Sequence, residues 1–436
     1  MIRLILSLWL MFIALPLRAA VDIQTLTTPG GIDAWLVEEH SIPFTALEIR
    51  FKGGTTLDPK GKRGVVNLMT GLLEEGAGDL DSRGFSEARE ALAASFNYRA
   101  YDDVVSISAR FLTETQDQAV ALLKSSIMDP NFDQIDIDRV REQVLSSIRS
   151  DKTDTATIAN LKFNSLAWGD HPYGSSSDGT EDSVKALTRE DIIAAHRATL
   201  SRDRLFVSAV GNITLEELST LLDQLFGDLP ATGAPLPVPA TYHMTGGITV
   251  VPFDTPQSVA LFGHQGIKRD DPDYMTAYIL NEVFGGDGQD SRLMTEVREK
   301  RGLTYGVGTV LLPMDYGELI MGQVQSDNSK MADAVQVIRD EWSKVAADAI
   351  TEEELNDAKT YLTGAYALRF DGNAPIARIM VGMQMIGLPP SYVTDRNDQI
   401  MAVTLDDIRR VAKRIYRPEA LHFVVVGRPE GLDSTN

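Results

Sequence analysis

Two stretches of the sequence are near copies of each other: Asp81-Ser82-Arg83-Gly84-Phe85-Ser86-Glu87-Ala88-Arg89-Glu90 and Asp290-Ser291-Arg292-Leu293-Met294-Thr295-Glu296-Val297-Arg298-Glu299, which agree at six of ten positions. A second pair follows later in the chain, Thr188-Arg189-Glu190-Asp191-Ile192 and Thr404-Leu405-Asp406-Asp407-Ile408, and an apolar run ending in glycine comes after each member. The spacings between the copies differ by only seven residues, 209 against 216. The sequence therefore predicts two copies of one fold.

Each copy combines predicted strands with predicted helices. In the first half, strand-like apolar patterns occur at 46–51, 104–111 and 205–210, and helical spacing occurs at 65–75, 84–94, 115–128 and 136–150. The second half has strand patterns at 258–262, 318–325 and 421–426 and helical patterns at 274–284 and 329–346. The elements lack regular βαβ alternation. The predicted fold class is α+β, with two homologous halves, each an antiparallel sheet with helices packed mainly on one face.

A proline-rich segment separates the halves. Pro230, Pro235, Pro237 and Pro239 fall within residues 229–243, and each proline removes a backbone donor and favours an extended path. The sequence therefore predicts a signal peptide at 1–20, an N-terminal half at 21–228, a linker at 229–243 and a C-terminal half at 244–436.

The first twenty residues have the pattern of a secretory signal. A positive start ending at Arg3 precedes an apolar run from Leu4 to Leu15, and Ala19 and Ala20 offer small residues for cleavage. The alternative, a membrane anchor, needs about 20 apolar residues, more than this run supplies. We expect an exported protein, periplasmic if the host is Gram-negative, with no membrane span after cleavage.

The composition excludes several functions. The chain has 436 residues, 41 Lys and Arg against 62 Asp and Glu, a net charge of -21 and no cysteine. This negative charge opposes the phosphate contacts that nucleic-acid binding requires. Without cysteine there can be no disulfides, no Cys-ligated zinc and no thiol nucleophile.

The candidate chemistry is sparse. None of the six histidines forms an HxxxH pair, the spacing that places two imidazoles on one helix face. The loop containing Gly285, Gly286 and Gly288 precedes a predicted helix, but it lacks GK[ST], and Asp287 would repel a phosphate. We interpret it as a flexible loop that another backbone can approach closely.

Arg298 and Tyr305 form a second candidate. A guanidinium and a phenol near each other could bind a peptide carbonyl and stabilise the oxyanion formed during hydrolysis. From the spacing alone, the more ordinary interpretation is a surface ion pair and a half-buried tyrosine.

Together these features resemble the pitrilysin/insulinase/mitochondrial-processing-peptidase family of zinc metallopeptidases. The resemblance covers essentially the whole mature chain: two homologous halves, a glycine-rich loop, then Ser291-Arg292-Leu293 and Glu296-Val297-Arg298-Glu299-Lys300-Arg301-Gly302-Leu303-Thr304-Tyr305. It implies a clamshell fold. It also implies that Arg298 and Tyr305 contact bound substrate, and that the loop of Gly285, Gly286 and Gly288 borders the substrate chamber.

The first half departs from the family's inverted zinc motif, HxxEH, which follows a glycine on the first helix. The matching stretch is Gly64-Val65-Val66-Asn67-Leu68-Met69-Thr70-Gly71. The two histidine ligands are replaced by Asn67 and Gly71, the glutamate base by Thr70, and the third ligand falls at Ser147. Gly71 has no donor atom, and the three neutral side chains cannot offset the charge of a dication or deprotonate its water. We expect no metal and no catalytic residue in this chain.

The resemblance implies a partner, because some family members are heterodimers in which one chain holds zinc and the other supplies the Arg/Tyr pair. We expect a zinc-free subunit of an exported peptidase, whose HxxEH-containing partner binds the zinc. The alternative is a non-enzymatic, peptide-binding or scaffold protein that keeps the clamshell fold.

Overall fold

The computed structural model describes residues 21–286 and 290–435. The predicted signal peptide and Gly288 therefore lie outside the described residues. Within the described ranges, no helix has the length and apolar composition required to cross a bilayer.

The N-terminal half is built on a six-stranded sheet with the order β1-β2-β8-β3-β7-β6. Its strands are β1 (Gln24–Thr27), β2 (Asp33–Glu38), β3 (Phe44–Lys52), β6 (Ser95–Ala100), β7 (Val104–Leu112) and β8 (Leu205–Gly211). All neighbours are antiparallel except β2 and β8, which are parallel. A separate two-stranded ribbon consists of β4 (Gly76–Ala77) and β5 (Leu80–Asp81).

The C-terminal half repeats this arrangement in a five-stranded sheet with the order β11-β12-β10-β13-β9. Its strands are β9 (Gly247–Pro252), β10 (Gln257–Gln265), β11 (Val307–Pro313), β12 (Glu318–Asp327) and β13 (His422–Gly427). The parallel pair is again the last strand of the half with the first, β13 with β9. The two sheets match strand for strand apart from β1, which confirms two homologous halves.

The parallel pairs refine the predicted antiparallel sheets. Strands β8 and β13 each return to their sheet after a long helical stretch, and such a crossover allows a strand to lie parallel to its neighbour. A hairpin connection would not allow this, so the remaining pairs, formed mostly by strands closer in sequence, are antiparallel.

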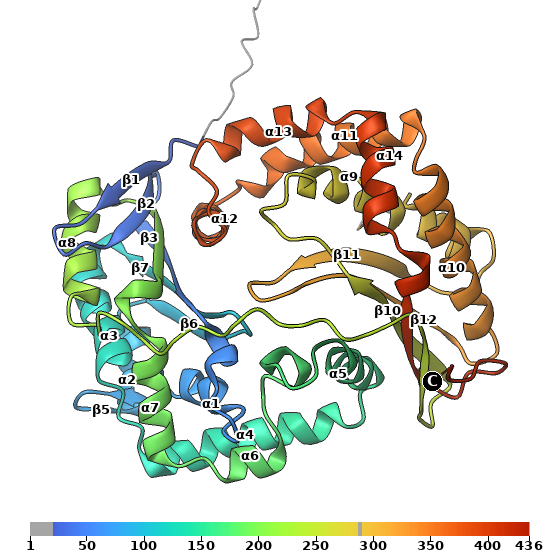
Figure 1. Ribbon diagram of the computed structural model, residues 1–436. Coiled ribbons are helices and arrows are strands. Elements are labelled where there is room, and N and C mark those ends of the chain that lie inside the picture. Colours follow the sequence, from blue (N-terminus) through green and yellow to red (C-terminus); the bar gives the residue numbers. More distant parts are fainter. Residues whose placement is uncertain (1–20, 287–289, 436) are drawn as a thin grey trace, which may run out of the picture.

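Helices cover the sheets (Figure 1). In the first half they are α1 (Val65–Gly71), α2 (Ser82–Ala91), α3 (Gln116–Met128), α4 (Gln134–Asp151), α5 (Thr155–Trp168), α6 (Glu181–Lys185), α7 (Arg189–Thr199) and α8 (Leu215–Phe226). In the second half they are α9 (Tyr274–Gly285), α10 (Met331–Asp348), α11 (Glu352–Tyr366), α12 (Asn373–Met385), α13 (Tyr392–Ala402) and α14 (Leu405–Ile415). Residues 227–246 contain no helix or strand; the domain boundaries given above remain predictions.

The later repeat pair forms the same cap in both halves. Thr188 and Thr404 accept the backbone N–H of Asp191 and Asp407, and those carboxylates accept the threonine N–H in return. This capping box fixes the start of α7 and α14 at the same place in each copy.

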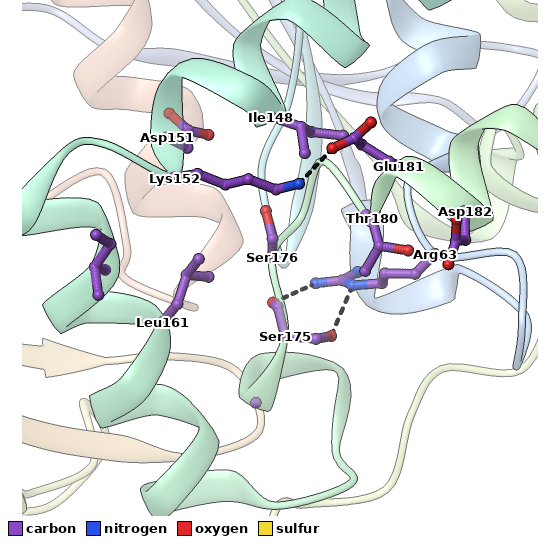
Figure 2. A pocket seen from close by; sticks show the side chains of 13 residues that line it. Arg63, Ile148, Asp151, Lys152, Leu161, Ser175, Ser176, Thr180, Glu181 and Asp182 are labelled. Atoms are coloured by element: carbon purple, nitrogen blue, oxygen red, sulfur yellow. Dashed lines mark hydrogen bonds and ion pairs between the residues drawn. The ribbon is translucent and has the colours of Figure 1, made fainter. Parts of the chain in front are cut away.

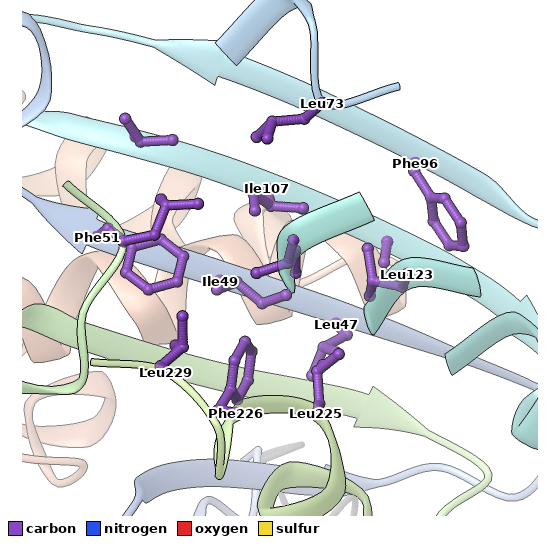
Figure 3. Close-up of a cluster of buried hydrophobic side chains, with 14 of the residues drawn as sticks. Leu47, Ile49, Phe51, Leu73, Phe96, Ile107, Leu123, Leu225, Phe226 and Leu229 are labelled. Atoms are coloured by element: carbon purple, nitrogen blue, oxygen red, sulfur yellow. The ribbon is translucent and has the colours of Figure 1, made fainter. Parts of the chain in front are cut away.

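Each half has its own apolar core between sheet and helices. Figure 3 shows the core of the N-terminal half, where Ile49 and Phe51 of β3 meet Leu225 and Phe226 of α8, all fully buried. Burying such side chains contributes roughly 1.5–3 kcal/mol each.

The opposite face of each sheet is covered by a helix from the other half. Helix α5 packs on β10 and β13 of the C-terminal sheet, and α12 packs on β3 and β8 of the N-terminal sheet (Figure 1). Ser208 of β8 donates to the backbone oxygen of Ala377 at 2.6 Å, and Gln384 donates to that of Val207 at 2.8 Å. The predicted arrangement, with helices packed mainly on one face of each sheet, therefore holds for each half considered alone. In the whole molecule, a helix from the other half covers the second face of each sheet.

Candidate functional site

Helix α1 is the element on which the family places its zinc motif. Its first turn is held by Asp58, whose carboxylate accepts the backbone N–H groups of Gly64 at 2.8 Å and Val66 at 2.9 Å. Gly64 has φ 95°, and a Cβ there would lie 2.5 Å from the backbone oxygen of Asp178. Glycine is required at this position because the positive φ disfavours other residues and because the backbone of Asp178 leaves no room for a side chain.

Three of the four degenerate motif positions lie on α1. The Asn67 amide donates to Asp178 Oδ1 at 2.9 Å, so it is already engaged within the chain. The Thr70 hydroxyl is buried and donates to the backbone oxygen of Val66 at 2.8 Å. A Cβ at Gly71 would meet Val140 of α4 at 3.3 Å. Neither polar side chain is left free to serve as a ligand.

The fourth position, Ser147, is exposed on α4. Helix α4 packs against α1, with Val140 beside Gly71 and Ser147 two turns further along the same face of the helix. The two helices are packed together, and the side chains that would bind a metal are missing from the predicted positions on both.

These residues do not fit a zinc ion. Zinc sites use imidazole, thiolate or carboxylate ligands, and none of the four positions supplies one. Throughout the described residues there is no cluster of three or more histidine, aspartate or glutamate side chains that could hold a metal. Asp178 is the nearest acid to Asn67, and burial raises its pKa, with repulsion from Asp151 adding to the effect.

A cavity of about 730 Å³ opens beside this site. Its walls are the end of α4, the start of α5 and the segment that leads into α6, with Arg63 at one side (Figure 2). Ile148 and Leu161 supply apolar walls. The cavity volume falls in the range of small-ligand sites.

The basic groups of this cavity are satisfied within the chain. Arg63 donates to Ser175 Oγ at 3.1 Å and to Asp58 at 3.1 Å, and Lys152 pairs with Glu181 (Figure 2). The hydrogen bond from Lys152 is the main cause that lowers the pKa of Glu181 to about 2. Arg63 therefore fastens the start of α1 to the 172–175 turn. Our sequence reasoning missed its role, although its position directly before Gly64 could have indicated it.

Arg298 lies on η5 (Met294–Glu299), a π-helix. Such helices are rare and frequently occur at functional sites. In the first half, the equivalent Arg89 pairs with Glu74 at 2.7 Å. Among the described residues, the Arg298 guanidinium has no hydrogen bond or ion pair, because the nearby Glu296 is paired with Lys300 and Arg301 instead. The arrangement differs from the surface ion pair that the spacing alone suggested.

Tyr305 projects into solvent with 88% of its surface exposed. It follows Gly302, which has φ 60°, and precedes β11. A large aromatic side chain this exposed is poorly explained by packing within the chain, since even one wall of a core would bury more of the ring.

A groove runs along β11, the edge strand of the C-terminal sheet. One part, of about 290 Å³, is lined by Tyr305 and the start of β11; the other, of about 370 Å³, is lined by Gly285, Gly286, the first four residues of β11 and neighbouring residues of β12. Gly306 and Gln323 line both parts. The structure thus brings Tyr305 and two of the predicted loop glycines to adjoining hollows that share residues of β11 and β12, whereas Arg298 does not line either part.

The fold and this site define a zinc-peptidase scaffold without zinc ligands. The description "Insulinase (Peptidase family M16)" matches residues 35–181, and "Peptidase M16 inactive domain" matches residues 186–362. The chain belongs to peptidase family M16, as an inactive member.

Relatives agree with this assignment. The non-peptidase homolog YmxG of Helicobacter pylori is 25% identical over 393 residues, which cover 89% of this chain and 90% of the relative. An uncharacterized zinc protease of Streptomyces coelicolor is 24% identical, covering 90% and 87%. A crystal structure of a peptidase M16 inactive domain from Pseudomonas fluorescens superimposes with a TM-score of 0.88 at 27% identity, covering 94% of this chain and 99% of that one.

Proposed function

We propose that this chain is the zinc-free subunit of an exported heterodimeric metallopeptidase. The observation that carries the proposal is a pair of side chains that the packing of the described residues does not explain: Tyr305, which is exposed, and Arg298, which has no polar partner among those residues. Both follow the glycine-rich loop in the half that retains the family's substrate-contacting motif.

The chemistry of the pair suits peptide hydrolysis. A guanidinium and a phenol can both donate to the carbonyl oxygen of a peptide, and their donation strengthens as that oxygen gains charge. The partner, carrying HxxEH, would hold the zinc and activate water. In this proposal Arg298 and Tyr305 bind the substrate and stabilise the tetrahedral intermediate, while Gly285 and Gly286 border the chamber.

The edge of β11 offers a place for an extended peptide. Among the described strands, β11 pairs only with β12, and the adjoining groove is lined in part by Gly306 and Gly308. Glycines let another backbone approach closely, and an extended peptide can add to an open sheet edge through main-chain hydrogen bonds.

The test uses the chain co-expressed with an HxxEH-containing paralogue from the same organism. We expect a stable heterodimer that cleaves peptides in a chelator-sensitive way, while neither chain alone reaches the same rate. Arg298→Ala and Tyr305→Phe should each lower kcat/KM by about 100- to 1000-fold, as loss of an oxyanion donor does. Arg83→Ala and Tyr361→Phe, at exposed positions elsewhere, serve as controls.

Full activity of the Arg298→Ala/Tyr305→Phe double variant in the assembled complex would refute the role given to the pair. Failure to form a complex with any such paralogue would favour the second candidate function, a non-enzymatic peptide-binding or scaffold protein. The similarity to a protein described as a non-peptidase homolog supports that alternative.

A further inference from the structure

A second cavity lies among the helices of the C-terminal half, beside α12. It has a volume of about 670 Å³ and is bounded by α12, by α9 and α13, and by the end of α11. It shares no lining residue with the cavity beside α1 or with the groove along β11. Its volume suits a small molecule.

The charge of this cavity is opposite to that of the protein. Acidic residues outnumber basic ones by 62 to 41 over the whole chain. Among the described residues that line the cavity, every charged side chain is an arginine: Arg269, Arg369, Arg378 and Arg396. Such a concentration of guanidinium groups without a lining carboxylate favours an anion.

Arg396 makes the strongest case, because it is only 5% exposed. Its guanidinium donates to the backbone oxygen of Leu362 at 3.2 Å and lies 4.3 Å from the ring centroid of Tyr366. Within the described part of the chain, no carboxylate pairs with it. Buried charges are normally paired, since desolvation without a counterion is costly. An anion in the cavity would supply the missing charge.

The other arginines are also held without a strong ion pair. Arg269 lies 4.2 Å from the ring centroid of Tyr274 and donates to the hydroxyl of Tyr392 at 3.3 Å. Arg369 is exposed, and it has no polar partner among the described residues. Arg378 lies 3.6 Å from Glu48, a carboxylate that already pairs with Arg50 at 2.7 Å. Their donors therefore remain available to a ligand.

The rest of the wall is aromatic and apolar. Four tyrosines line the cavity, Tyr274, Tyr278, Tyr366 and Tyr392, together with Met275 and Met383. Tyrosine rings and methionine side chains form surfaces on which a ring or a short aliphatic body can pack. A bare inorganic ion would leave this surface unused, so the cavity suits an anion with an apolar part.

We propose that this cavity binds a small organic anion. Its carboxylate or phosphate group pairs with Arg269 and Arg396, the exposed Arg369 adds a third positive charge, and its apolar body packs on the tyrosines. The site needs no partner chain and no metal, so it stands whether or not the chain is a peptidase subunit.

The test is calorimetric titration of the purified chain with three probes of one shape: 1-naphthyl phosphate, 1-naphthoate and the neutral 1-naphthalenemethanol. We expect at least one anion to bind about tenfold or more tightly than the neutral probe, with an affinity that falls as salt rises. Tighter binding of the phosphate would identify phosphate esters as the ligand class, and tighter binding of the carboxylate would identify carboxylic acids.

Substitutions of the cavity arginines test whether the anion binds in this cavity. Arg269→Gln and Arg369→Gln should each weaken the tighter anion by about 3- to 30-fold, as loss of a charge-assisted hydrogen bond does. Arg409→Gln, on α14 outside the cavity, should leave the affinity unchanged. Circular dichroism confirms that each variant is folded. Equal affinity for the neutral probe, unchanged affinity in both cavity variants, or no binding of either anion at millimolar concentration would overturn the proposal.

Discussion

The side-chain amide of Asn67 donates to Asp178 Oδ1 at 2.9 Å, at the helix position that the sequence resemblance aligns with the first histidine of the family's zinc motif. Asn67 is therefore part of an internal hydrogen-bond network that ties α1 to the 175–180 loop. Replacing Asn67 alone by histidine would not create a metal site, because Thr70 is buried and Gly71 packs closely against Val140 of α4.

Thr70 allows a direct test of that packing. It is 1% exposed and its hydroxyl is satisfied by the backbone oxygen of Val66. Thr70→Val should cost about 1 kcal/mol in the free energy of unfolding, whereas Thr70→Glu, the family's catalytic residue, should cost about 3 kcal/mol or more by burying an unpaired carboxylate. Urea unfolding measures both. Equal stability of the two variants would mean that the site still accommodates an acid.

Metal removal should leave the protein unchanged. Since the four motif positions supply no imidazole or carboxylate, we expect the same thermal midpoint with excess chelator and with equimolar zinc. Elemental analysis of the purified chain checks the stoichiometry independently. A zinc-dependent rise of several degrees, together with one bound zinc per chain, would require ligands other than those considered above.

Asp103 should make the stability depend on pH. Burial raises its pKa to about 6, against an ordinary value of 3.8, although Tyr173 donates to it at 2.6 Å. The folded state thus binds this proton more tightly than the unfolded state, so its contribution to stability rises as the pH falls from about 6 to about 4.

Asp103→Asn isolates this contribution, because the amide oxygen can still accept from Tyr173. The variant should gain stability relative to the parent at pH 7, and the difference should shrink as the pH falls towards 4, with a slope of at most about 1.4 kcal/mol per pH unit. Urea unfolding at several pH values measures it. A difference that is constant with pH would show that the carboxyl is ionised throughout.

The exchanged helix α12 should tolerate little added volume. Ala377 is fully buried between α12 and β8. Ala377→Leu should destabilise the protein by about 1–3 kcal/mol through overpacking. Ala402→Leu, at an exposed position on α13, is the matched control and should have a small effect. A neutral Ala377→Leu variant would indicate that α12 is loosely seated.

The repeated fold could be predicted from the sequence because the repeated segments form equivalent structural elements in the two halves. Thr188 and Thr404 cap equivalent helices, and each of these helices is followed by a strand that ends in a buried glycine. The exchange of α5 and α12 could not be predicted, since apolar spacing shows that a helix buries one face without showing which sheet receives it.

The candidate site was predictable only in part. The motif positions on α1 are contiguous in sequence, so the missing ligands could be read directly. The groove beside Tyr305 and the arginine-lined cavity each combine segments far apart in the chain, such as Arg269 with Arg369, and no local pattern indicates their proximity. Among the described residues Arg298 has no polar partner, because Glu296 pairs with Lys300 and Arg301 instead, and the local sequence does not indicate which of the three cations Glu296 will bind.

Because the halves exchange helices, each half needs a helix of the other half to cover one face of its sheet. Without α5, the C-terminal strands would expose Leu261 and Val424, which now pack against Phe163. A protease cut within residues 229–243 should therefore release no separate domain: the two fragments would stay together as a noncovalent complex. Either fragment expressed alone would lack a wall of its own core and should aggregate or remain partly unfolded until its complement is added.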